Sequence, residues 1–431
     1  MSKRNENKKG NKKTKVGWIP EEWECLHLKS VCLNSGEYGA NAPAIPFSHN
    51  HPRYVRITDI TEDGNLKTDN MKSIESTRSE GFILNSGDFL FARSGATVGK
   101  TYLHIANNQK YAFAGYLIRF IPNPKKINGS YLKAFTTSSR YWYWVQTTIR
   151  AGAQPNVNAT EYSSLIIPLP PLPEQKKIAD IISAWDRAIE QVSRLINAKT
   201  KLKKALMQQL FTGKRRFKEF NHETHEIHKK KKKGKLPERW QKMKLHDFLK
   251  HVSRPVPRPD KEYLALGIRS HGKGTFLRTV GNPDEVMMDT LFEVRENDLI
   301  VNITFAWEGA IAIVKKTDEG ALVSHRFPTH VFKRDKVIPE YFRHVIRTKW
   351  FVHQLGLISP GGAGRNRVMS KRNFLSLAVS IPHVDEQKKI AAVLNRFDKE
   401  ISLLGNQLSA LKEQKTGLMQ KLLTGQVRVK V

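Results

Sequence analysis

One glycine-rich stretch of the sequence carries residue types that bind phosphate. Ser94–Thr101 reads Ser-Gly-Ala-Thr-Val-Gly-Lys-Thr and is similar to a phosphate-binding loop of the form Gly-x-x-x-x-Gly-Lys-Ser/Thr. Ser94 stands where the first glycine belongs. The residues that follow, Tyr102–Ile105, have the pattern of a strand, whereas a phosphate site needs a helix N-terminus there. We therefore expect a turn between two strands, with Arg93, Ser94, Thr97 and Lys100 exposed on it.

Carboxylates and histidines offer two further candidate sites. Glu174-Gln175-Lys176 recurs as Glu386-Gln387-Lys388, and a nuclease needs carboxylates and a lysine around a divalent metal. No Pro-Asp pair lies shortly before either copy, and a glutamate in the first turn of a helix is explained by the helix dipole. His222, His225 and His228 lie in a charged segment without other ligand types, which favours a solvated linker over a metal site. No Asn-Pro-Pro-Tyr or Asp-Pro-Pro-Tyr methyltransferase motif occurs, so we expect no catalytic residue, no metal and no cofactor in this chain.

The sequence contains an internal repeat. Residues 174–213 align without a gap on residues 386–425, at an offset of 212, and 16 of the 40 aligned positions are identical. Weaker matches extend upstream, among them Trp23 with Trp240, Asp88 with Asp298 and Gly99 with Gly309. The chain therefore consists of a globular unit and a long helix, followed by the same again.

The two repeated segments have the pattern of coiled-coil helices. Their apolar residues alternate four and three positions apart, an average period of about 3.5, and each segment ends at Thr-Gly, a C-cap signal. At 1.5 Å per residue each forms a rod of about 57 Å. We expect the helices to pack on each other in antiparallel fashion; the alternative is that each apolar stripe packs on its own globular unit. The expected contact residues are Ile178, Ile182, Trp185, Ile189, Val192, Ile196, Leu206, Leu210, Ile390, Leu394, Phe397, Ile401, Leu404, Leu408, Leu411, Leu418 and Leu422.

The rest of the chain divides around these helices. We expect an α+β fold, with two mixed α/β domains in a pseudo-twofold repeat, separated by two long antiparallel coiled-coil helices. Strands are expected at Tyr54–Ile60, Asp88–Ala92, Leu117–Ile121, Leu299–Ile303, Ala310–Val314 and Thr329–Phe332, and helices at Tyr131–Thr148 and Pro339–Leu355. The expected segments are a basic disordered tail (1–15), domain 1 (16–172), helix 1 (173–213), a basic linker (214–235), domain 2 (236–384), helix 2 (385–425) and a short tail (426–431).

Composition indicates the partner and the compartment. The formal net charge is +33, with Lys and Arg spread along the whole chain, so nucleic acid is favoured over a basic tail on a neutral protein. The two cysteines, Cys25 and Cys32, are too few for a disulfide framework and are expected to be reduced thiols. The lysine-rich N-terminus lacks a signal-peptide core, and no stretch approaches the roughly 18 apolar residues of a membrane span. We expect a cytoplasmic protein that does not contact membranes.

Taken together, these residues resemble the specificity subunits of type I restriction–modification enzymes. The resemblance depends on Ile167–Ile178 with its partial copy Ile381–Ile390, on Leu206–Lys214 and Leu418–Gly425, and on Trp23, Trp240 and Gly95–Lys100. The second repeat departs from the first, because Thr304–Gly309 replaces Gly95–Gly99 and its junction lacks the proline-rich run. These departures concern the contact residues rather than the family.

The resemblance implies a non-catalytic subunit that confers DNA-sequence specificity. It implies two target-recognition domains, each reading one half of a two-part site in double-stranded DNA, with the helices between them. As partners it implies two modification subunits, which bring S-adenosylmethionine and methylate adenine, and two motor-nuclease restriction subunits; ATP and Mg are also expected on partner subunits. The alternatives are a self-sufficient restriction nuclease and an architectural nucleic-acid-binding protein without sequence preference.

The residues that contact DNA are expected in loops that combine glycine with polar side chains. Two such loops are residues 151–158 and 360–367. Direct readout requires side-chain donors and acceptors in the major groove. We expect these in the first domain to be Arg56, Arg93, Ser94, Thr97, Lys100, Gln154 and Asn156, and in the second Arg269, Lys273, Thr304, Trp307, Arg365 and Arg367. The alternative for each is an ordinary surface position.

Overall fold

The computed structural model describes residues 10–149, 155–220, 237, 239–361 and 367–430. The chain divides into two compact units. Unit 1 comprises Met1–Arg194 and Gly405–Val431, and unit 2 comprises Leu195–Leu404. Each unit therefore contains one globular body and one half of each long helix.

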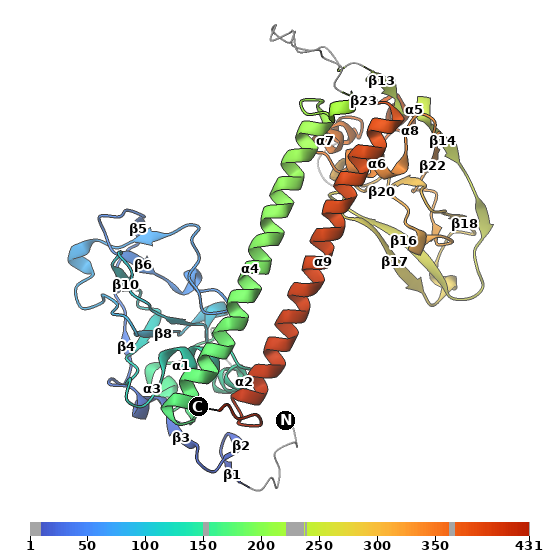
Figure 1. Cartoon of the computed structure of the whole chain (residues 1–431). Coiled ribbons are helices and arrows are strands. Elements are labelled where there is room, and N and C mark those ends of the chain that lie inside the picture. Colours follow the sequence, from blue (N-terminus) through green and yellow to red (C-terminus); the bar gives the residue numbers. More distant parts are fainter. Residues whose placement is uncertain (1–9, 150–154, 221–236, 238, 362–366, 431) are drawn as a thin grey trace. The chain divides into compact units, whose positions relative to one another are not determined.

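Unit 1 combines two four-stranded sheets with short helices (Figure 1). The sheets have the strand orders β10-β6-β7-β5 and β4-β11-β8-β9. The hairpin β1-β2 and the pair β12-β3 form two separate two-stranded sheets. The strands are β1 (Asn11–Thr14), β2 (Gly17–Pro20), β3 (Glu24–His27), β4 (Glu37–Tyr38), β5 (Ile45–Pro46), β6 (Arg53–Val55), β7 (Lys72–Ser73), β8 (Phe89–Ala92), β9 (Thr101–Leu103), β10 (Tyr111–Phe113), β11 (Leu117–Phe120) and β12 (Ile166–Leu169). The short α-helices are α1 (Gly129–Thr136), α2 (Ser139–Thr148) and α3 (Ala159–Ser163).

Unit 2 contains a four-stranded sheet, β14-β22-β19-β20, a five-stranded sheet, β15-β18-β21-β16-β17, and the pair β13-β23. The strands are β13 (Gln241–Lys244), β14 (Leu249–Val252), β15 (Pro255–Pro257), β16 (Tyr263–Arg269), β17 (Gly274–Val280), β18 (Thr290–Glu293), β19 (Leu299–Val301), β20 (Ile311–Ile313), β21 (Leu322–Val323), β22 (Thr329–Phe332) and β23 (Ala378–Ile381). The short α-helices are α5 (Leu245–Phe248), α6 (Pro339–Val345), α7 (Lys349–Leu357) and α8 (Lys371–Ser376).

The two units share one architecture and differ in one sheet. The order β4-β11-β8-β9 in unit 1 corresponds to β14-β22-β19-β20 in unit 2, and α1, α2 and α3 correspond to α6, α7 and α8. The other sheet has a parallel pair in both units, β6 with β10 and β16 with β21, but in unit 2 it also has a long antiparallel hairpin, β16 with β17. The expected fold class, a repeated mixed α/β body with long helices, is confirmed.

Several expected elements are shorter than the sequence indicates. The single helix expected over 131–148 is broken, because the Ser138 side chain accepts a hydrogen bond from the backbone of Tyr141 and starts a new helix. Thr348 does the same for Phe351 in unit 2. The strand expected at Tyr54–Ile60 ends at Val55, because Asp59 accepts a hydrogen bond from the Arg56 amide and closes a 3-10 turn.

Two expected tails contain ordered residues. Asn11–Thr14, expected in the disordered tail, form β1 and pair with Gly17–Pro20. The short C-terminal tail contains Arg428, which binds two glutamates of unit 1. Most of the expected linker, residues 221–235 with its three histidines, lies outside the described residues, as do residues 1–9.

The long helices α4 (Leu172–Phe211) and α9 (Val384–Leu422) run antiparallel within each unit (Figure 1). In unit 1, Lys415 of α9 binds Asp186 of α4 at 2.6 Å. In unit 2, Lys203 of α4 binds Asp398 of α9 at 2.5 Å. These two lysines interrupt the apolar stripes at the same step of the repeat, and each has a carboxylate partner on the facing helix.

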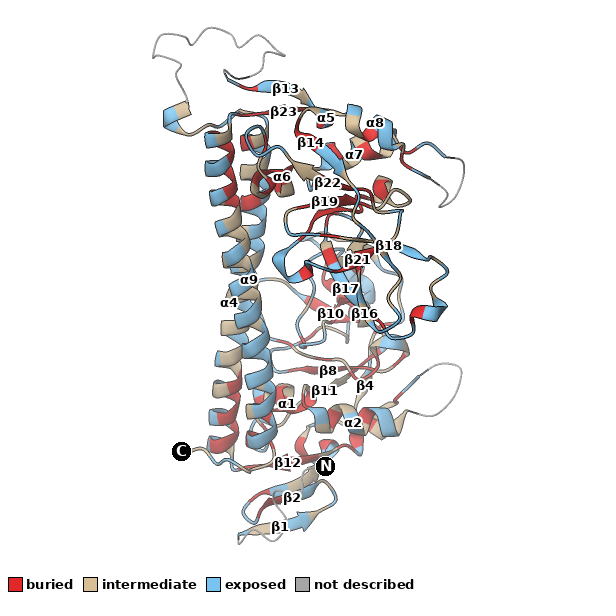
Figure 2. Ribbon diagram, turned by 90° about the vertical axis from the view of Figure 1, so that its right-hand side faces the viewer, coloured by how far each residue is buried: buried red, intermediate tan, exposed pale blue. Residues whose placement is uncertain are grey.

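The apolar stripes pack in two different ways. At the helix ends they enter the globular cores: Ile178, Ile182 and Leu422 are buried in unit 1, and Leu210, Ile390 and Leu394 in unit 2 (Figure 2). Leu418 and Leu206 pack against these cores. The remaining expected contact residues are half-buried: Trp185, Ile189, Val192, Ile196, Phe397, Ile401, Leu404, Leu408 and Leu411. The residues at the helix ends thus pack on globular cores, and apolar contact of the remaining residues with the facing helix stays a prediction.

A buried glutamate closes each unit at the start of its long helix. In unit 2, Glu386 accepts hydrogen bonds from Trp240 Nε1 at 3.1 Å and from Arg216, whose Nε and Nη2 lie at 2.9 and 2.8 Å. The Glu386 and Arg216 side chains are only 2% and 8% exposed. In unit 1, Glu174 is held in the same way by Trp23 and Arg428. In each unit this arginine lies just after the end of the long helix that begins in the other repeat: Arg216 follows α4 and Arg428 follows α9.

The neighbouring glutamine fixes the start of α1 in unit 1 and the start of α6 in unit 2. Gln175 accepts a hydrogen bond from the Asn128 amide and donates to the carbonyls of Lys126 and Pro170. Gln387 makes the equivalent contacts in unit 2. The repeated Glu-Gln pair is therefore a structural anchor: a buried polar group requires partners, and both side chains have them.

Candidate nucleic-acid interface

The two loop regions singled out in each repeat lie side by side. In unit 1, the Val157 amide donates to the Arg93 carbonyl and the Gly95 amide to the Pro155 carbonyl, both at 2.9 Å. In unit 2, the Met369 amide donates to the Ile303 carbonyl at 2.8 Å. The turn after β8 thus contacts the segment that precedes α3 in unit 1, and the turn after β19 contacts the segment that precedes α8 in unit 2. We call this place the junction of each unit.

A glycine lets a helix pack closely on each junction. Gly99 and Gly309 both have a left-handed backbone conformation, with φ of 87° and 75°. A Cβ atom would lie 2.9 Å from Val145 of α2 at Gly99, and 3.1 Å from Val352 of α7 at Gly309. A larger residue would therefore meet both backbone strain and a steric clash, which explains why these glycines correspond in the repeat.

Two of the expected DNA-contacting cations of unit 1 are bound to carboxylates. Arg56 donates to Asp59 at 3.0 and 2.7 Å, and Lys100 lies 2.8 Å from Glu62. The Thr97 hydroxyl donates to the Ser94 carbonyl, and η5 (Gly95–Thr97) leads into strand β9, so the predicted turn between strands is confirmed. The expected exposure of this turn is wrong: Ser94 is buried and forms a backbone bridge with the exposed Asn156, and Arg93, Thr97 and Lys100 are half-buried.

Arg93 has no such carboxylate partner. Its guanidinium carbon lies 4.7 Å from the centre of the Tyr38 ring, and Tyr38 is 43% exposed. Within the described part of the chain, Arg93 makes no side-chain hydrogen bond or ion pair, and its Nε is buried without an acceptor. The guanidinium is therefore supported on one face by an aromatic ring.

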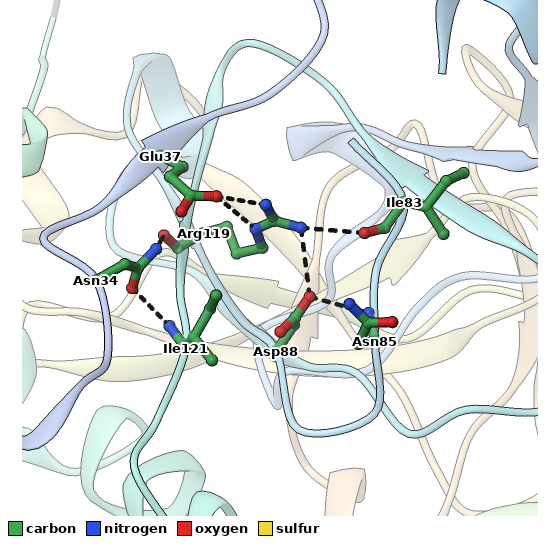
Figure 3. Close-up of polar contacts among 7 residues, drawn as sticks. All are labelled: Asn34, Glu37, Ile83, Asn85, Asp88, Arg119 and Ile121. Carbon is green, nitrogen blue, oxygen red and sulfur yellow. Dashed lines mark hydrogen bonds and ion pairs between the residues drawn. The ribbon is translucent and has the colours of Figure 1, made fainter. Parts of the chain in front are cut away.

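A charged cluster around Arg119 includes Glu37 of β4, the strand that also carries Tyr38 (Figure 3). Arg119 of β11 donates from Nε to Glu37 of β4 at 2.9 Å and from Nη1 to the Ile83 carbonyl at 3.0 Å. Glu37 directly precedes Tyr38, and the two strands pair in register. Burial is the largest single influence and raises the pKa of Glu37, but the hydrogen bonds from Arg119 and Asn34 and the charge of Arg119 together outweigh it and lower the pKa.

Asp88 is the second carboxylate of this cluster. It accepts a hydrogen bond from the Asn85 amide at 2.9 Å and lies 3.6 Å from Arg119. Burial raises the pKa of Asp88, and the Asn85 amide and Arg119 oppose the shift. In unit 2 the corresponding Asp298 pairs with Arg254 at 2.6 Å, so in both repeats this buried aspartate has an arginine partner.

The junction of unit 2 is built around Trp307. Trp307 lies in η8 (Ala306–Glu308), to which the turn between β16 and β17 is tied: the His271 amide donates to the Glu308 carbonyl at 2.7 Å. The guanidinium carbon of Arg367 lies 5.2 Å from the centre of the Trp307 ring. Trp307 Nε1 and Arg367 Nε are both buried without a hydrogen-bond partner.

A hollow of about 720 Å³ opens beside this pair. Among the described residues, its lining contains several side chains that are cationic or become so on protonation, and no carboxylate. The lining residues are His271, Trp307, Arg347, Lys349, Val352, His353, Gly356, Leu357 and Arg367. An anionic group, such as a DNA phosphate, matches this lining.

The remaining expected residues of unit 2 are near the same turn or outside the described chain. Arg269 lies over the Phe276 ring at 5.4 Å, and Lys273 is in the turn that follows. Thr304 accepts a hydrogen bond from Arg326 at 3.3 Å. Gln154 and Arg365 fall outside the described residues.

Sequence reasoning missed several residues that the geometry makes important. Tyr38 has no signal in the sequence, because its role depends on a strand pairing. Arg347, Lys349 and His353 lie on or beside α7 and gave no motif. Arg216 and Arg428 differ by the same 212 positions as the repeat, so the repeat itself carried the signal for them.

The described residues contain no group of three or more His, Cys, Asp and Glu side chains placed to hold a metal ion. None of the helices within them combines the length and the apolar composition that a bilayer crossing requires.

Comparison with known proteins identifies the same repeat. The family model for the type I restriction modification DNA specificity domain matches residues 20–203 and again 237–413. Two relatives from Methanocaldococcus jannaschii are the specificity subunits of the type I restriction enzymes MjaX and MjaVIII. The chain is 28% identical to the first, covering 97% of both chains, and 24% identical to the second, covering 96% of this chain and 94% of the relative.

Solved structures show a similar fold. The S subunit of a type I restriction-modification system from M. genitalium has a TM-score of 0.58 at 13% identity, covering 93% of this chain and 96% of that one. A chain from a structural study of complex assembly and conformational transition of the type I R-M system has a TM-score of 0.54 at 16% identity, covering 95% and 99%.

Proposed function

The chain belongs to the type I restriction modification DNA specificity domain family and is a specificity subunit of a type I restriction–modification system; we propose that each of its units reads one half of a two-part DNA site. The observation that carries this proposal is the repeated junction. In both units a turn, a returning segment and a glycine-packed helix meet, and an arginine that has no carboxylate partner among the described residues lies over an aromatic ring.

Charge supports double-stranded DNA as the ligand. A net charge of +33 favours a polyanion, because each neutralised phosphate releases counterions. Arg347 and Lys349, which line the hollow beside Trp307, can bind a backbone phosphate, whereas the junction arginines Arg93 and Arg367 offer donors to base edges. Phosphate contacts position the protein and base contacts specify the sequence, so both kinds are required.

We propose the partners and cofactors on family grounds. The chain assembles with two modification subunits, which bring S-adenosylmethionine, and two restriction subunits, which use ATP and Mg. The chain itself catalyses nothing and recruits these activities to DNA. The recognition domains are residues 16–172 and 236–384, and the helices 173–213 and 385–425 set the distance between half-sites.

Selection from a random DNA library tests the proposal. The purified full-length chain is incubated with the library and competitor DNA, and bound sequences are recovered and aligned. We expect two short sequence elements separated by a constant unread gap, and no methylated or cleaved DNA from the chain alone. Binding without sequence preference, or methyl transfer without a partner, would contradict it.

A further inference from the structure

The cations near the junctions are not equally available to a ligand. In unit 1, carboxylates neutralise Arg56 and Lys100, whereas Arg93 has no hydrogen-bonded or ionic partner among the described residues. In unit 2, Arg326 is bonded to Thr304, whereas Arg367 has no hydrogen-bonded or ionic partner among the described residues. An uncompensated, half-buried guanidinium in each unit has a reason to exist if DNA supplies its partner.

The geometry leaves one edge of each guanidinium open. Arg93 Nε and Arg367 Nε are buried, and one face of each group is directed at an aromatic ring, Tyr38 or Trp307. The two terminal nitrogens, Nη1 and Nη2, are the donors left for a ligand. This planar pair matches two neighbouring acceptors, which a guanine presents in the major groove as O6 and N7.

The arrangement does not follow from the repeat. At the offset of 212, Arg367 of unit 2 corresponds to Pro155 of unit 1. The position of Arg93, whose carbonyl accepts from Val157 in unit 1, is taken in unit 2 by Ile303, whose carbonyl accepts from Met369. Arg93 comes from the outgoing side of the junction and Arg367 from the returning side. Two different positions thus produce the same pair of arginine and ring, which indicates a common requirement of the ligand and not inheritance of a packing contact.

We propose that Arg93 and Arg367 each read a guanine, one in each half-site, and that Tyr38 and Trp307 are positioning residues that hold them. This inference rests on the proposed function. Burying Nε and supporting the plane on a ring fixes the direction of the donor pair before DNA binds, so less conformational entropy is lost on contact. Arg119 and Glu37 extend this support in unit 1, because they fix the strand that carries Tyr38.

Library selection with full-length variants tests the proposal. R93K and R367K keep the charge but lose the paired donors, so each is expected to lose roughly ten- to hundredfold discrimination at one G·C pair, in one half-site only. R93A and Y38A should relax the same base pair, and Y38F should retain it. The matched controls R78A and R334A alter exposed arginines of units 1 and 2 and should leave both half-sites unchanged.

The outcomes separate the possible sources of failure. If R93K keeps its sequence preference while R93A weakens binding to all sequences and lowers the salt slope, Arg93 contacts a phosphate and the proposal is wrong. A wild-type half-site without a G·C pair overturns it for that unit. A wild-type chain that selects no sequence at all refutes the proposed function instead, and urea unfolding of each variant identifies any loss of fold.

Discussion

Replacing Arg216 by alanine should destabilise unit 2 and leave unit 1 intact. Glu386, which Arg216 binds through two hydrogen bonds, has a side chain that is only 2% exposed. Without the arginine, Trp240 Nε1 is the hydrogen-bond donor that the structure still provides to this carboxylate. Removing one member of a buried ion pair costs about 3–5 kcal/mol, because the other charge stays buried without compensation.

The expected loss can be measured locally. For a unit of this size about 1 kcal/mol corresponds to roughly 2–4 °C in Tm, so we expect R216A to lower the Tm of unit 2 by about 6–20 °C. Hydrogen exchange followed by mass spectrometry assigns the loss to peptides of residues 195–404 or of the remainder. R215A, which removes an exposed arginine from the neighbouring position, is the matched control.

A double-mutant cycle decides whether the ion pair is the cause. E386Q removes the charge and keeps a hydrogen-bond acceptor for Trp240, so R216A should cost far less in the E386Q background than in the wild type. The equivalent R428A in unit 1 should cost less than R216A, about 1–2 kcal/mol, since Arg428 is 40% exposed and screened by solvent. Equal costs of R216A in both backgrounds, or equal loss of protection in both units, would refute the reasoning.

Three further predictions follow from charge and geometry. Burial lowers the pKa of both His330 and His344 to about 4, whereas an unfolded histidine titrates at about 6.5, so the unfolded chain binds protons more readily as the pH falls. Urea unfolding should therefore show unit 2 losing about 2 kcal/mol of stability per histidine between pH 7 and pH 5, and H344Q should reduce that loss. Inserting four helical residues within Ser193–Lys203 adds about 6 Å to α4, so the selected gap should grow by about one or two base pairs at roughly 3.4 Å each, with both half-sites unchanged; a constant gap would show that the helices do not set it. DNA affinity should fall at least about tenfold between 50 and 200 mM salt, measured by fluorescence anisotropy, and a flat response would contradict phosphate neutralisation.

The sequence predicted the long-range organisation because repetition and period are written in local patterns. The apolar spacing of about 3.5 residues located both long helices to within a few residues of α4 and α9. The same repeat also contained the buried clusters around Glu174 and Glu386, although the helix dipole alone was offered as their explanation. Their true partners, Trp23 with Arg428 and Trp240 with Arg216, lie far away in the sequence.

The local errors have a common physical origin. Ser138 and Thr348 divide expected helices, because a hydroxyl that caps a backbone amide outweighs apolar periodicity over a few residues. Tyr38 was missed as a supporting residue, whereas DNA contact by Arg56 and Lys100 stays a prediction, and carboxylates bind both side chains in this structure. Composition shows which cations a chain has, but only the folded structure shows which ones remain without a partner.

The most direct test of the central claim is an exchange of one recognition domain. Residues 16–172 are replaced by the first domain of another family member, and DNA selected by the full-length chimera is compared with that of the wild type. If each unit reads its own half-site, one half-site changes and the other keeps its sequence; replacing residues 236–384 should alter only the opposite half. A simultaneous change of both half-sites in either chimera would show that the two units do not read DNA independently.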